Sequence, residues 1–146
     1  GGLLAIRILE AGLKVLQSVS ECILQPQSDL DKVRQFLHQH GFQIVQEKML
    51  IDEGKYYVVM RVLHGEERIY TEAEDIYGRF LINEKHLVLK EYLEKQKAVK
   101  EKLLLALKDK TSEKSHERQQ ELLHELQIIN ETITRMVDEN AEQRPD

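Results

Sequence analysis

The sequence predicts an α/β protein in which a small α/β unit precedes an antiparallel two-helix coiled coil. Within the first 63 residues, helical apolar patterns alternate with short runs rich in β-branched and aromatic residues. From about residue 83 onward, apolar residues recur at helical spacing through two long segments. A chain of 146 residues accommodates one ordinary domain, or a small packed unit with a helical extension.

The N-terminal part is expected to form a helix, a strand and a second helix. Residues 3–16 carry leucines and isoleucine at steps of three and four, which predicts an amphipathic helix. Residues 19–24 form a short apolar run that stops before a proline, as a buried strand does. Ser28 or Asp29 can cap the next helix, and His40-Gly41 is a plausible stop for it.

A β-hairpin is predicted next. Residues 42–51 and 56–63 are rich in strand-forming residues, and the intervening Asp52-Glu53-Gly54-Lys55 supplies turn chemistry. The acidic segment that follows, together with the helix-breaking Gly78, indicates a linker over residues 66–82.

The C-terminal part predicts two helices joined by a polar turn at residues 109–116. In the first, over residues 83–108, Gln96 and Lys100 interrupt the apolar stripe. The second has the 4-3-4-3 spacing of a coiled-coil seam, in Leu122, Leu126, Ile129, Ile133 and Met136. The expected division is 1–65 for the α/β unit, 66–82 for the linker, 83–140 for the helical hairpin and 141–146 for a disordered tail.

Composition excludes several classes of protein. A net charge of −5 argues against a uniformly basic nucleic-acid coat. The single cysteine, Cys22, predicts a small buried side chain in a reducing, cytoplasmic setting. No apolar run is long enough to span a bilayer, so no membrane association is expected. The six histidines show no metal-ligand spacing, and motifs of hydrolases, P-loop NTPases and metalloproteases are missing.

Lysines are concentrated on the first long helix, where residues 85–110 hold eight of them against four carboxylates. Such a local excess could bind RNA phosphates. A solvated surface that keeps the helices soluble is the alternative, and composition alone favours it.

Four short segments carry a resemblance. They are Gly1-Gly2-Leu3-Leu4-Ala5-Ile6-Arg7-Ile8-Leu9-Glu10, Ile23-Leu24-Gln25-Pro26-Gln27, Asp52-Glu53-Gly54-Lys55-Tyr56-Tyr57 and Tyr77-Gly78-Arg79-Phe80-Leu81-Ile82-Asn83-Glu84-Lys85. In this order, and followed by a helical hairpin, they resemble the family of bacterial tRNA adenine-N1 methyltransferases that act on adenine 22. Gln27 replaces the family's Asn, and Arg79 stands where Pro is usual. The resemblance covers essentially the whole chain.

The resemblance implies the C-terminal part of a Rossmann-like class I methyltransferase domain that uses S-adenosyl-L-methionine, followed by the coiled coil. The glycine-rich turn and the acidic residue that bind the cofactor would lie upstream of this sequence, so the fragment alone is expected to be inactive. Gly1 and Gly2 would shape the cofactor-facing loop. Gln25, Pro26 and Gln27 would border the substrate pocket, and tRNA would contact Lys90, Lys97 and Lys100. The resemblance assigns no catalytic residue.

Two rival interpretations stay open. A coiled-coil interaction module without catalytic activity would use the α/β part only as an anchor. A metal or redox protein is poorly supported by one cysteine and no ligand cluster. If the chain is a fragment of such an enzyme, loss of the other strands of a parallel sheet leaves an unpaired apolar edge at residues 19–24, which predicts self-association.

Overall fold

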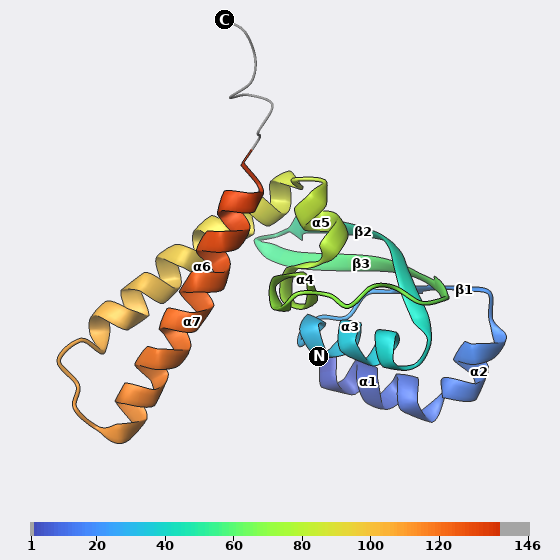
Figure 1. Ribbon diagram of the computed structural model, residues 1–146, viewed down its shortest axis with the longest axis horizontal. Coiled ribbons are helices and arrows are strands. Elements are labelled where there is room, and N and C mark those ends of the chain that lie inside the picture. The colour runs from blue at the N-terminus through green and yellow to red at the C-terminus, as the bar shows by residue number, and fades with distance from the viewer. Residues whose placement is uncertain (1, 138–146) are drawn as a thin grey trace, which may run out of the picture.

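A three-stranded antiparallel sheet and a long helical hairpin dominate the computed structural model, which describes residues 2–137 (Figure 1). The predicted tail at 141–146 lies outside the described residues, as does Gly1. In chain order the elements are α1 (Gly2–Ala11), α2 (Leu13–Ser18), β1 (Glu21–Leu24), α3 (Leu30–Gln39), β2 (Phe42–Asp52), β3 (Lys55–His64), α4 (Glu72–Tyr77), α5 (Arg79–Asn83), α6 (Leu87–Ala106) and α7 (Glu113–Arg135).

The sheet has the strand order β1-β3-β2, and both pairings are antiparallel. The predicted β2–β3 hairpin is confirmed. It closes at Glu53 and Gly54, whose φ angles of 49° and 78° suit a two-residue turn with both central residues left-handed. Within residues 2–137, β1 pairs only with β3, so its other edge is unpaired.

A β-bulge near Val45 keeps one face of the long strand β2 buried. Ile44 pairs with Val62, whereas Gln46 pairs with Arg61, so one residue is inserted between them. Because side chains alternate along a strand, this insertion shifts the buried positions from even to odd numbers. Glu47 and Met49 therefore lie on the same buried face as Ile44.

Helices α1 and α3 contact each other on one side of the sheet (Figure 1). Val33 and Leu37 of α3 are fully buried and belong to the same core as Met60 and Val62 of β3. The single helix predicted over residues 3–16 is wrong in one respect, because the chain breaks at Gly12 into α1 and α2. Glycine lacks a Cβ and lowers helix propensity, which accounts for a break at this position.

The segment predicted as a linker forms α4 and α5 and packs into the core. Leu81 and Ile82 are buried, and so is Glu74. Thr71 begins α4 with a capping box, in which its hydroxyl accepts a hydrogen bond from the Glu74 amide and the Glu74 carboxylate accepts one from the Thr71 amide. Gly78 separates the two helices. The sequence therefore located the break at Gly78, but it did not predict that the segment forms two helices that pack into the core.

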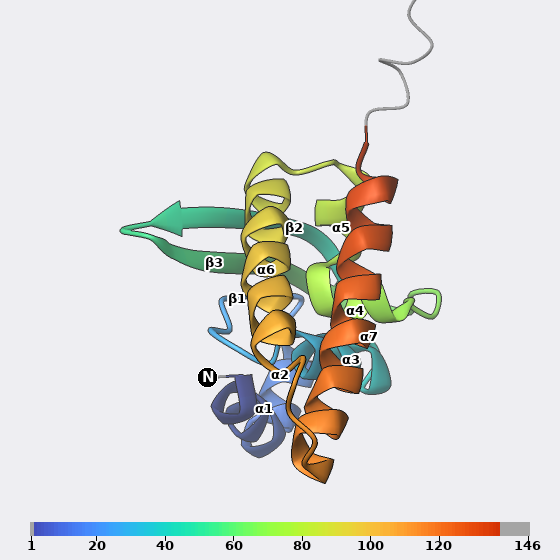
Figure 2. The same cartoon turned by 90° about the vertical axis from the view of Figure 1, so that its left-hand side faces the viewer.

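Helices α6 and α7 form a hairpin that extends away from the sheet, and they lie side by side in Figures 1 and 2. The predicted seam of α7 is buried at Leu122, Leu126, Ile129 and Met136, and half-buried at Ile133. On α6 only Leu89 and Leu93 are buried, both near the sheet. Along the described chain, no helix combines the length and apolar character that a membrane span requires.

Candidate functional site

A cleft of about 760 Å³ lies where the loop after β1, the β2–β3 hairpin and the base of the helical hairpin meet. Its volume falls within the range of small-molecule sites, roughly 300–1,000 Å³. The loop supplies Pro26, Gln27 and Asp29, while the strands supply Tyr56 and its neighbours. The cleft thus joins parts of the chain that are far apart in sequence.

Aromatic side chains form much of its wall. Four of the five tyrosines in the chain line the cleft, namely Tyr56, Tyr57, Tyr77 and Tyr92. The rings of Tyr56 and Tyr92 meet edge to face, with centroids 5.0 Å apart. Burial raises the pKa of Tyr77 and of Tyr92, so both hydroxyls stay protonated near neutral pH. The wall can therefore hold a flat, uncharged group by stacking.

A lysine stands over this aromatic wall. The Lys95 ammonium nitrogen lies 5.5 Å from the centroid of the Tyr56 ring, within the range of a cation–π contact. Contacts with Tyr56 and Glu91 raise the pKa of Lys95, so the side chain stays charged. Positive charge is thereby placed next to a surface suited to a planar ring.

A buried ion pair fixes the elements around the cleft. Arg34 of α3 donates from Nε to Glu47 of β2 at 2.9 Å, and neither side chain is exposed. Its Nη1 donates to the carbonyls of Asp75 and Ile76 at 2.7 and 2.9 Å. Burial raises the pKa of Glu47, and the Arg34 guanidinium opposes that rise. The pair ties the end of α4, next to Tyr77, to the sheet.

Glu67 also connects α3 to β2, and it adds α5. Its carboxylate accepts hydrogen bonds from the Ile44 amide and the Tyr70 hydroxyl, the latter at 2.7 Å, and it lies 3.0 Å from the His38 ring nitrogen. Arg79 of α5 approaches it at 3.4 Å. These hydrogen bonds lower the pKa of Glu67, although burial alone would raise it. Glu67 thus holds α5, which precedes the helical hairpin in the chain, to α3 and β2.

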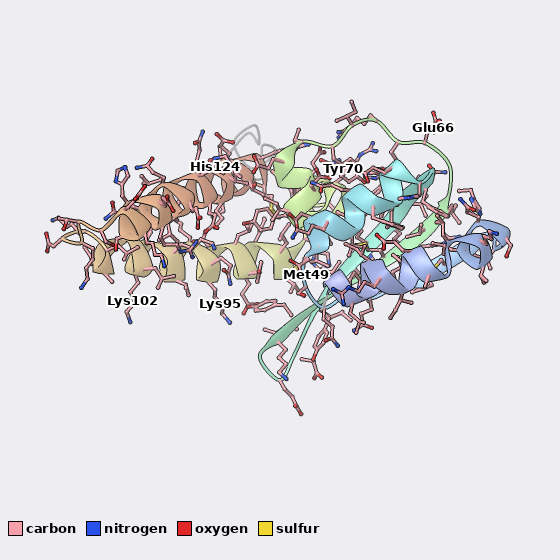
Figure 3. The ribbon with its side chains drawn as sticks, turned by 90° about the horizontal axis from the view of Figure 1, so that it is seen from below. Met49, Glu66, Tyr70, Lys95, Lys102 and His124 are labelled. Atoms are coloured by element: carbon pink, nitrogen blue, oxygen red, sulfur yellow. The ribbon has the colours of Figure 1, made fainter. Side chains whose placement is uncertain are left out.

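The lysines of α6 do not all face the same way. Figure 3 shows Lys95 and Lys102 on the side toward which the β2–β3 hairpin projects, with His124 of α7 on the opposite side. Lys100 instead bridges to α7, with its nitrogen 3.0 Å from a Glu125 carboxylate oxygen. Lys90 and Lys97, the two other lysines expected to contact tRNA, are both half-buried.

The predicted pocket residues are only partly brought together. Pro26 and Gln27 line the cleft, with Pro26 buried and Gln27 exposed, whereas Gln25 is exposed outside it. Gly2 begins α1, and Gly1 lies outside the described residues. Sequence reasoning did not single out the tyrosines. Their number was a usable signal, because they account for most of the aromatic residues in a chain that has few.

The structure offers no metal centre among residues 2–137, since no group of three His, Cys, Asp or Glu side chains there could hold an ion. Cys22 is half-buried, and burial raises the pKa of its thiol. A protonated thiol is a poor nucleophile and a poor metal ligand.

Comparison with known proteins identifies the family. The family model for TrmK, tRNA (adenine(22)-N(1))-methyltransferase, matches residues 1–131. The tRNA (adenine(22)-N(1))-methyltransferase of Bacillus subtilis strain 168 is 28% identical over 142 residues, which cover 91% of this chain and 58% of that protein.

Solved structures agree with this assignment. Sp1610 of Streptococcus pneumoniae, described as a candidate tRNA (m1A22) methyltransferase, is 37% identical with a TM-score of 0.78, covering 91% of this chain and 58% of that one. It has also been solved in complex with S-adenosyl-L-methionine. A Streptococcus agalactiae protein of the NADB-Rossmann superfamily is 32% identical with a TM-score of 0.76, covering 91% of this chain and 56% of that one. The α/β fold is therefore Rossmann-like, and the chain spans little more than half the length of these relatives. It belongs to the tRNA (adenine(22)-N(1))-methyltransferase family.

Proposed function

We propose that this chain supplies the substrate-binding side of a cytoplasmic methyltransferase that transfers a methyl group from S-adenosyl-L-methionine to N1 of adenine 22 in tRNA. The observation that carries the proposal is the tyrosine-lined cleft, which Pro26 and Gln27 border in a chain of this family. In open α/β sheets, ligands bind beyond the carboxyl ends of the strands, and Pro26 and Gln27 follow the carboxyl end of β1.

The cleft suits an extruded base. Adenine N1 takes part in Watson–Crick pairing, so the base must be unpaired or flipped before N1 can react. Tyr56 and Tyr92 offer aromatic surface on which it can stack, and base–aromatic stacking is worth about 1–3 kcal/mol. The cofactor supplies the methyl group and the leaving thioether. The protein's part is to hold the N1 lone pair in line with that methyl group and to exclude water.

We further propose that the chain alone does not methylate tRNA. Among residues 2–137, none of β1, β2 and β3 is followed by a glycine-rich turn of the kind that binds a nucleotide cofactor. Gly1 and Gly2 would border the cofactor, with Gly2 at the start of α1. The relatives extend well beyond the matched region, which supports cofactor binding by parts of the enzyme outside that region.

The helical hairpin is proposed to bind tRNA through the side of α6 that carries Lys95 and Lys102 (Figure 3). Lys90 and Lys97 are retained as expected contacts on the same helix. Lys100 is a weaker candidate than the sequence suggested, because Glu125 already neutralises it. We also propose that α6 and α7 pack as a coiled coil, a proposal that the buried seam of α7 supports.

A graft tests this function. The matched 58% of the Streptococcus pneumoniae protein would be replaced by this chain, and methylation of an unmodified tRNA transcript would be measured by a primer-extension stop at adenine 22. We expect the graft to methylate that adenine, and neither the chain alone nor a transcript with guanine at position 22 to give a stop. A folded graft that binds cofactor and tRNA but gives no stop would contradict the proposed function. Methylation by the chain alone would contradict only its inactivity.

An exposed apolar edge supports a further proposal, that the chain self-associates through β1. Ile23 is 60% exposed on this strand, and Ile8 of α1 is 62% exposed. Unpaired strand edges with apolar side chains favour pairing with another chain.

A further inference from the structure

A second apolar surface lies at the far end of the helical hairpin, away from the sheet. Glu101, Leu104 and Leu105 of α6 and Lys108 of the turn that follows it line a groove of about 470 Å³ there, with Gln119 and Leu123 of α7 on its other side. Leu105 is 69% exposed and Leu123 48% exposed. We call these four positions the α6 stripe. The spacing of Glu101, Leu104 and Leu105 places them on one face of the helix, and Lys108 continues the same side of the groove just beyond the end of α6.

The α6 stripe is complementary to itself. Glu101 and Lys108 lie at equal sequence distance on either side of the midpoint between Leu104 and Leu105. If the C-terminal end of a second α6 packs antiparallel about that midpoint, each Leu104 faces a Leu105, and each Glu101 faces the Lys108 that follows α6 in the other copy. Such reciprocal contacts define an interface with two-fold symmetry.

The charges of the α6 stripe are available for such a contact. Within the described residues, the ion pairs of α6 are Lys95–Glu91 and Lys100–Glu125, and neither involves Glu101 or Lys108. Among the residues that the structure describes, no aromatic side chain lines the groove around Leu104 and Leu105, so a base has nothing there on which to stack, and Glu101 would repel phosphate. The chemistry of the groove therefore favours a protein partner over RNA.

We propose that the α6 stripe binds the α6 stripe of a second copy of this chain, with Glu101–Lys108 ion pairs flanking a leucine centre. The contact spans about two helical turns, so it forms a small interface of the transient class. This association is independent of the proposed methyltransferase activity, because the stripe lies outside the tyrosine-lined cleft.

Reversing the charge of Glu101 or Lys108 tests whether these two residues face each other across the proposed contact. Glu101→Lys places lysines opposite lysines in a homodimer, and Lys108→Glu places carboxylates opposite carboxylates. Each variant alone should dimerise through this surface at least about tenfold more weakly than the parent. An equimolar mixture of the two should recover association, since complementary pairs form only between unlike copies. Lys102→Glu, on the same helix but off the stripe, is the matched control.

Sedimentation velocity at low salt would measure the dissociation constants. Native mass spectrometry, with one variant labelled with nitrogen-15, would show whether heterodimers exceed homodimers. Leu105→Glu should abolish this contact while leaving helix content by circular dichroism unchanged, because Leu105 is already exposed. The proposal is overturned if the parent chain shows no self-association at the highest soluble concentration. It is equally overturned if the mixture shows no preference for heterodimers, or if association depends on added tRNA.

Discussion

Gly78 occupies the point where α4 ends and α5 begins, against the buried Arg34–Glu47 pair. Its φ is +96°, and a Cβ added there would lie 2.2 Å from a Glu47 carboxylate oxygen and 2.9 Å from Arg34 Nη2. Because that pair is fully buried, neither side chain can move aside cheaply. We expect Gly78→Ala to lower the free energy of unfolding by more than about 3 kcal/mol.

Gly54 provides the control for that substitution. It has a φ of +78° in the β2–β3 turn, with nothing within 4 Å of an added Cβ. Gly54→Ala should therefore cost only the conformational penalty, about 1–2 kcal/mol. Urea denaturation of both variants would separate the steric cost at Gly78 from the cost of a positive φ angle, which both positions share. If both variants lost the same free energy of unfolding, the buried ion pair would have moved to make room for the added methyl group.

Glu74 should make the free energy of unfolding depend on pH in the acidic range. Hydrogen bonds from Arg68 lower the pKa of its carboxyl to about 2, from 4.5 for an unperturbed group, with smaller contributions from the Thr71 amide and Arg135. A pKa that is lower in the folded state stabilises the fold above the unfolded value, and the stabilisation is lost as pH falls through the folded value. The advantage of the parent over Glu74→Gln should be full above pH 4.5 and vanish toward pH 2.

Urea denaturation from pH 2.5 to 6 would measure that difference. Glu94→Gln, on the exposed face of α6, is a suitable comparison. A stability gap between the parent and Glu74→Gln that stayed constant across this range would contradict the role given to the Arg68–Glu74 pair.

The function of individual residues could be predicted only where a short segment of the sequence carries a recognisable pattern. The short segment that contains Pro26 and Gln27 resembles the methyltransferase family, and both residues line the cleft. Tyr92 could not be placed there from sequence, because its approach to Tyr56 depends on how α6 is docked on the sheet. The Lys100–Glu125 pair likewise depends on the packing of α6 against α7, because its two residues are 25 positions apart in sequence.

At the scale of elements, the lysines of α6 should fall into two groups according to how much they contribute to tRNA binding. Lys102 is exposed on the side shown with the β-hairpin in Figure 3, whereas Lys100 is paired with Glu125. We expect Lys102→Ala to weaken tRNA binding and to reduce the salt-dependence slope by roughly one, as loss of one phosphate contact does. Lys100→Ala should leave the slope nearly unchanged. Fluorescence anisotropy with labelled tRNA at several salt concentrations would show whether the ranking is reversed.

Elements with strong local signals were predictable, and those defined by packing were not. The β2–β3 hairpin followed from the turn residues Asp52-Glu53-Gly54-Lys55 between β-rich segments, and the seam of α7 from its spacing. Helices α4 and α5 were hidden in an acidic stretch, because their stability comes from the Thr71 capping box and from burial of Leu81 and Ile82. Local composition carries little information about such contacts.

At the scale of the whole molecule, the proposed β1 edge and the α6 stripe lie at different ends of the structure (Figure 1). Each would pair two chains about its own two-fold axis. Alternating use of two such axes produces open chains of molecules and not a closed dimer. We therefore expect the average mass of the parent protein to rise continuously with concentration.

Variants at the two surfaces should limit this growth at defined sizes. Ile23→Lys puts a charge on the strand edge, the device by which natural edge strands avoid pairing, so assembly should stop at a dimer joined through α6. Leu105→Glu should likewise stop at a dimer joined through β1, and the double variant should be monomeric. Multi-angle light scattering across a concentration series would measure these limits. If Ile23→Lys assembled like the parent, the β1 edge would not be an association surface, and the α6 contact alone would account for at most a dimer.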